Sequence, residues 1–127
     1  MAMRPPKGEI RNEMREKAMR EVILAQLGAL RADAGVELVA CKDTCVEDYL
    51  TGKADALAVA MQMVEAKALI ETMTCFLRHE ETRNMNMAES ARSCSKDTMA
   101  RLREGAAAGY MAASRVVTEV REANKYE

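Results

Sequence analysis

The sequence predicts an all-helical protein. Ala, Met, Glu, Arg and Leu are abundant among the 127 residues, and these side chains lose little rotamer freedom in a helix. Aromatic residues make up only 3%, and the two prolines are adjacent, at Pro5 and Pro6. Apolar residues recur at spacings of three and four. The core is therefore expected to consist of Leu, Val, Ile, Met and Ala packed between helices.

An N-terminal helix is predicted from about residue 7 to residue 33, after a short tail at residues 1–6. Pro5 and Pro6 suit the beginning of a helix, and Gly35 is expected to end it. Two apolar stripes follow the helical spacing, and the segment 22–30 is expected to be the better buried part. The stripes are Ile10, Met14, Ala18, Val22 and Ala25, and Met19, Ile23, Leu27 and Leu30.

Residues 34–52 are predicted to form a connector that carries Cys41 and Cys45. Thr44 and Glu47 match a capping box, which favours a short helix over residues 45–50, ended by Gly52. Residues 36–42 fit either an extended segment or a helical stripe, and the sequence leaves both open.

The second half predicts a long antiparallel helical hairpin. Its arms are expected at about residues 53–82 and 86–124, with the turn near Asn84 and Met85 and a cap pair at Asn86 and Glu89. Together with the N-terminal helix and the connector, the hairpin would make residues 1–127 a single helical domain.

The predicted turn also fixes a register between the two arms. Cys75 and Cys94 lie at equal distances from it, which makes them a candidate disulfide if their Cα atoms come within about 4.4–6.8 Å. A reducing compartment would instead keep both as small buried thiols. The same register predicts a close-packed helical seam, in which Ala56, Ala60 and Val64 of the first arm face Ala113, Gly109 and Gly105 of the second.

One cysteine motif has a recognisable shape. The stretch CKDTCVEDYL, from Cys41 to Leu50, contains Cys-x3-Cys and resembles the second cysteine motif of the small translocase chaperones of the mitochondrial intermembrane space. Those chaperones join two Cys-x3-Cys pairs on facing helices by disulfides and escort hydrophobic precursors. The resemblance covers ten residues, and no further Cys-x3-Cys pair lies upstream. It makes the mitochondrion the first organelle to test.

A zinc site is the other arrangement that the cysteines suggest. Cys41 and Cys45, with Cys75 and His79, give two pairs at a spacing of four, so each pair would share a helical face. Four such ligands would form a closed structural zinc site. The commoner metal-binding pattern uses a two-residue gap, and we therefore expect no cofactor, with zinc as the alternative.

The sequence contains no pattern typical of an enzyme, a nucleic-acid-binding protein or a membrane protein. There is a single histidine and no glycine-rich phosphate loop, so we expect no enzymatic activity. The formal net charge is −1, and glutamates alternate with the basic residues near the N-terminus, which argues against nucleic-acid binding. The most apolar stretch, residues 54–77, contains Asp55, Glu65 and Lys67, which argues against a membrane span. No targeting segment is recognised, and the expected location is intracellular, either soluble or bound in a complex.

These observations favour a non-enzymatic helical interaction protein, expected to be an accessory subunit of a larger protein assembly, with other protein subunits as partners. Long helices leave much lateral surface, and the N-terminal helix can cover only one of the apolar sides of the predicted 53–82 helix. The pattern also allows a homo-oligomer. The alternative is a chaperone or regulator whose fold depends on a disulfide or on zinc.

Overall fold

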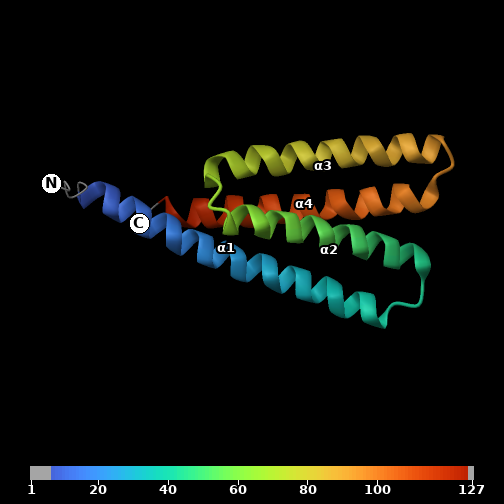
Figure 1. The fold of residues 1–127 in the computed structure, drawn as a ribbon, viewed down its shortest axis with the longest axis horizontal. Coiled ribbons are helices and arrows are strands. Elements are labelled where there is room, and N and C mark those ends of the chain that lie inside the picture. Colours follow the sequence, from blue (N-terminus) through green and yellow to red (C-terminus); the bar gives the residue numbers. More distant parts are fainter. Residues whose placement is uncertain (1–6, 126–127) are drawn as a thin grey trace.

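The structure is a computed structural model that describes residues 7–125, and the described chain is built from four long helices (Figure 1). They are α1 (Lys7–Ala40), α2 (Thr44–Glu65), α3 (Ile70–Ser93) and α4 (Asp97–Asn124). The all-helical prediction is confirmed. The predicted tail at residues 1–6 lies outside the described residues.

The central element is α4, which packs against both α2 and α3, while α1 packs mainly on α2 and partly on α4. Figure 1 shows that the chain reverses direction at each turn, so α3 and α4 form a long antiparallel hairpin, as predicted, whereas α2 and α4 run parallel. Although α2 and α3 are consecutive, they make few contacts with each other. Among the described residues, no helix is both long and apolar enough to cross a membrane.

The predicted connector at residues 34–52 is wrong, because helices occupy almost all of it. The first helix continues through Gly35 to Ala40, so most of residues 36–42, which fit either an extended segment or a helix, are helical. The side chain of Asp43 caps α2 by accepting a hydrogen bond from the backbone N–H of Cys45 (2.9 Å). The helix that begins there does not stop at Gly52 but continues to Glu65.

The predicted helix at 53–82 is interrupted by a turn between Glu65 and Ile70. Lys67 adopts a left-handed conformation (φ 60°). The N–H of Lys67 donates to the carbonyl of Val64, and the N–H of Ala68 donates to that of Met63 (both 3.0 Å). These two bonds form a Schellman motif, which satisfies the last carbonyl groups of α2.

The predicted hairpin turn at Asn84 and Met85 is also misplaced, because α3 continues through it to Ser93. The turn comes later in the chain, where Ser95 is left-handed (φ 59°). The N–H groups of Ser95 and Lys96 donate to the carbonyls of Arg92 (3.0 Å) and Ala91 (2.8 Å), which is a second Schellman motif. Asn86 and Glu89, predicted as a cap pair, therefore lie inside α3.

The register predicted for the small-residue seam is wrong, although its six residues are all buried. The partner of α4 at the glycines is α2 in a parallel orientation. A Cβ atom on Gly109 would lie 2.6 Å from the carbonyl oxygen of Lys53 and 2.8 Å from the Cβ of Ala56. One on Gly105 would overlap the carbonyl oxygen of Tyr49. The seam therefore joins helices that are not consecutive in the chain.

Gly52 makes the reciprocal contact from α2. A Cβ at this position would overlap the carbonyl oxygen of Leu102 in α4. At Gly52 and Gly105 the direction that a side chain would occupy therefore points at a carbonyl of the other helix, an arrangement that favours weak Cα–H···O contacts. The two backbones can approach this closely only because both positions are glycine.

The core draws on all four helices and lies on the C-terminal side of these glycines in α2 and α4. Its largest fully buried side chains are aliphatic or methionine: Ile23, Leu27, Leu57, Val64, Met73, Leu77 and Val117. Arg20 of α1 also donates hydrogen bonds to the carbonyls of Lys67 (3.4 Å) and Ala68 (3.1 Å), so α1 binds the turn at the C-terminal end of α2 directly.

The glycines give a first prediction with an internal control. We expect Gly105→Ala to lower the free energy of unfolding by about 3 kcal/mol, because the added Cβ forces α2 and α4 apart, and Gly109→Leu to act in the same direction. Gly35→Ala should instead raise it by about 1 kcal/mol, since nothing lies within 4 Å of that position. Urea unfolding of the three variants tests this, and a Gly105→Ala variant as stable as the parent would contradict the backbone contact.

The two left-handed residues give a second prediction. Lys67→Gly and Ser95→Gly should each raise the free energy of unfolding by about 0.5–1 kcal/mol, because glycine adopts this conformation without a Cβ clash. Gln62→Gly, in the last turns of α2, is the control and should lower it by about 1 kcal/mol. Thermal melts of the three variants would refute the turn assignments if the first two were destabilised like the control.

Candidate interaction surface

The outer face of α1 is apolar and has no partner within the described chain. Large apolar side chains on α1 remain well exposed, with exposed fractions of 67% for Met14, 44% for Val22, 70% for Val36 and 90% for Val39. The opposite side of the same helix carries Ile23 and Leu27, which are fully buried. The helix is therefore apolar on two sides, and the bundle covers only one.

The exposed side follows a regular repeat. Seven exposed positions alternate between steps of four and three, and every one is Ala or Val. This set, which we call the outer stripe, comprises Ala18, Val22, Ala25, Ala29, Ala32, Val36 and Val39. An apolar repeat averaging 3.5 residues is the pattern by which one helix packs along another. The stripe therefore has the spacing of a helix-packing face.

The C-terminal end of the outer stripe borders a shallow apolar groove of about 500 Å³. None of its lining residues has a polar side chain: they are Ala32, Gly35, Val36, Val39 and Ala40. The helix predicted from the sequence ends at residue 33 and so excludes most of this region. Val22 belongs to the segment expected to be better buried, but it is exposed, whereas Ile23 and Leu27 of that segment are buried as expected.

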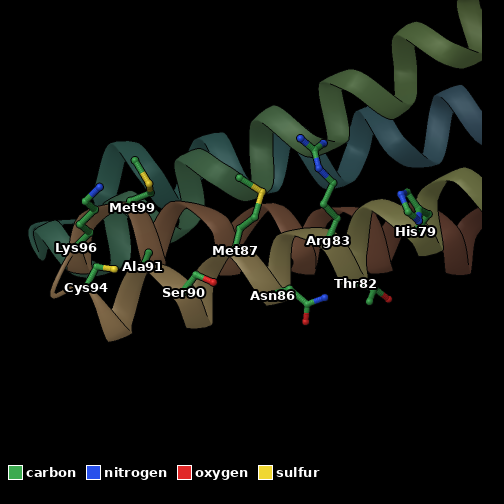
Figure 2. Close-up of a pocket in the computed structure, with 10 residues that line it drawn as sticks. All are labelled: His79, Thr82, Arg83, Asn86, Met87, Ser90, Ala91, Cys94, Lys96 and Met99. Carbon is green, nitrogen blue, oxygen red and sulfur yellow. The ribbon is translucent and has the colours of Figure 1, made fainter.

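A second surface feature is a groove of about 620 Å³ that follows α3 to the beginning of α4 (Figure 2). Figure 2 shows His79, Arg83 and Met87 extending from one side of α3, while Thr82 and Asn86 extend from the other. None of the ten lining residues is acidic. The groove combines methionine with basic groups.

A polar cluster joins α3 to α4. The buried side chain of Asn84 donates to the carbonyl of Glu80 (2.7 Å) and accepts a hydrogen bond from Arg103 of α4 (3.2 Å). Arg83 forms an ion pair with Glu80 (3.2 Å). The pKa of the Tyr110 hydroxyl at this site is raised above its ordinary value, mainly because the hydroxyl is partly buried and secondly because the Glu80 carboxylate is near. These groups largely satisfy one another, so their role is to hold α3 on α4.

Two further ion pairs tie α4 to its neighbours. Arg101 donates two hydrogen bonds to one carboxylate oxygen of Asp48 in α2 (3.1 and 2.9 Å), and this bonding raises the pKa of the Arg101 guanidinium. Arg92 of α3 pairs with Glu104. The charged residues at these positions join elements of the bundle and are already occupied by partners.

The structure contradicts the predicted pairing of Cys75 with Cys94. Cys75 lies near the beginning of α3 and Cys94 caps its end, so about 28 Å of helix, at about 1.5 Å per residue, separates them. A disulfide between them within one chain is excluded, because the turn that would have made them neighbours lies at Ser95 and not at Asn84. Both are free and exposed, so the alternative of two buried thiols is wrong as well.

The four residues of the zinc alternative are likewise separated. Cys41 and Cys45 lie just before and just after the beginning of α2, whereas Cys75 and His79 lie in the first half of α3, which begins at the opposite end of the bundle (Figure 1). In the part of the chain that the structure describes, no group of three or more His, Cys, Asp or Glu side chains is placed to hold a metal ion. The geometry therefore gives no support to a fold that depends on these cysteines.

Comparison with known proteins identifies no relative: no protein family, curated protein or solved structure matches this chain.

The separated cysteines give a third prediction. Cys45→Ser, Cys75→Ser and Cys94→Ser, all at exposed positions, should each change the free energy of unfolding by less than about 0.5 kcal/mol. Melts in the presence of a thiol reductant or a zinc chelator should coincide with the untreated melt. Loss of folding in the Cys45→Ser variant, or on chelation, would instead establish the cysteine-dependent alternative.

Proposed function

We propose that this chain is a non-enzymatic helical interaction protein, an accessory subunit of a larger protein assembly, and that it docks a partner helix along the outer stripe of α1. The single observation that carries the proposal is the exposure of Val22, Val36 and Val39 on one helical face. Contiguous apolar surface of this kind marks sites of protein interaction. The mitochondrion is the first compartment to test, on the resemblance of residues 41–50 alone.

The stripe favours association with a partner helix because its apolar side chains are less costly when they are removed from water. Burying apolar surface stabilises an association by about 25 cal/mol per Å², and alanine and valine lose little side-chain entropy when they are covered. Alanine also lets the axis of a partner helix approach closely. At the three valine positions an isolated chain gains nothing from this composition, because lysine or glutamate there would favour both helix and solubility.

A charge placed on the stripe tests the proposal. Val36→Glu should leave the fold intact, since glutamate is a better helix former than valine and the position is 70% exposed. It should abolish recovery of partner proteins when the tagged full chain is purified gently from its own source and examined by native mass spectrometry.

Met85→Glu is the matched control. It introduces the same charge at an apolar position on α3 that is 47% exposed and should retain the partners. Equal recovery with the Val36→Glu variant and the parent chain would overturn the docking assignment. Recovery of the parent chain as a single copy, with neither a second copy nor another protein, would overturn the subunit proposal in the same experiment.

A further inference from the structure

The outer stripe matches itself when two copies are placed antiparallel about a two-fold axis level with Leu27. The facing pairs are then Ala25 with Ala29, Val22 with Ala32, and Ala18 with Val36. Within residues 18–36 each valine of the stripe therefore faces an alanine, and the gap between the helices stays even. A parallel pair in register would instead place valine on valine and alanine on alanine, which leaves the gap uneven.

The charges beside the stripe favour the same arrangement. Arg11 and Arg15 continue its spacing toward the N-terminus, whereas Asp33 and Glu37 lie beside its C-terminal half. Arg15 and Asp33 are five helical turns apart, so they lie along the same edge of the helix. In antiparallel packing about a two-fold axis, the same edge of the stripe in the two copies lies side by side, and the two edges run in opposite directions. The basic end of one stripe then lies beside the acidic end of the other, and the two helix dipoles oppose each other.

The position of α1 leaves room for this contact. The side of α1 that packs on the bundle is the side of Ile23 and Leu27, and the stripe lies on the opposite side. Figure 1 shows α1 along one edge of the bundle, beginning beyond the end of the other three helices. The two bundles of a pair would therefore lie on opposite sides of a central α1–α1 contact.

We propose that the outer stripe binds a second copy of this chain, α1 against α1, antiparallel about a two-fold axis near Leu27. The inference rests on the proposed function, because it names the partner of the same surface. It implies an isologous dimer in which each copy contributes the same residues.

The test is the mass of the purified full chain in solution, measured by light scattering during size-exclusion chromatography. The chain of 14.1 kDa should elute with twice its mass, Val36→Glu with the mass of a single chain, and Met85→Glu as the dimer. A parent chain with the mass of one copy at all concentrations, or a Val36→Glu variant that stays dimeric, would overturn the inference.

Cross-linking then tests the direction of packing. In a background with all four cysteines replaced by serine, a mixture of Ala25→Cys and Ala29→Cys chains should oxidise to a mixed disulfide dimer in preference to either homodimer. Preferential homodimers of Ala29→Cys would indicate parallel packing and contradict the proposed axis.

The outcomes also separate this inference from the proposed function. A monomeric parent chain that still recovers partners from its source, and loses them in the Val36→Glu variant, would assign the stripe to a different protein. The proposed function would then stand and the second copy would be excluded. A monomer whose recovery is unaffected by Val36→Glu would overturn both.

Discussion

The close contact between the backbones of α2 and α4 is the constraint on which the rest of the structure depends. Gly52 and Gly105 leave no room for a side chain against Leu102 and Tyr49 of the facing helix. Because α2 and α4 run parallel, the chain must return between them, and α3 is that return. A hydrogen bond from Arg103 to Asn84 and an ion pair between Arg92 and Glu104 join α3 to α4, so α4 is packed on two sides.

This arrangement determines which side of α1 the bundle covers and which side stays exposed. The side of Ile23 and Leu27 is buried against the bundle, and Arg20 binds the turn at the end of α2. No further helix is available to cover its other side among residues 7–125. The exposed valines of the outer stripe are therefore a direct consequence of how the helices are ordered, and the docking proposal follows from them.

The composition of the chain is sufficient to predict helices, but its glycines are poor guides to where the helices end. Gly35 and Gly52 are expected to stop helices, yet both lie inside one. The two turns that the sequence does not predict have Lys67 and Ser95 in the left-handed conformation, and neither residue type signals a helix end. Whether a glycine ends a helix or admits a neighbouring backbone depends on tertiary packing, which local spacing does not contain.

The same limit applies to the candidate sites. The symmetric positions of Cys75 and Cys94 predict a disulfide only if the turn lies at Asn84. Asn84 is instead buried within α3 and accepts a hydrogen bond from Arg103 of α4, a helix pairing that residue spacing alone cannot predict. The outer stripe is partly visible in the sequence, because its first residues follow the helical repeat. Its most exposed residues, Val36 and Val39, lie beyond the predicted end of the helix.

Hydrogen–deuterium exchange of the protein purified with the partners proposed for it, compared with the isolated Val36→Glu variant, tests the central claim most directly. Covering the outer stripe should slow amide exchange across residues 18–40 in the assembly and leave the amide exchange of α3 unchanged. Protection confined to the groove from His79 to Met99, with no change along α1, would contradict the account.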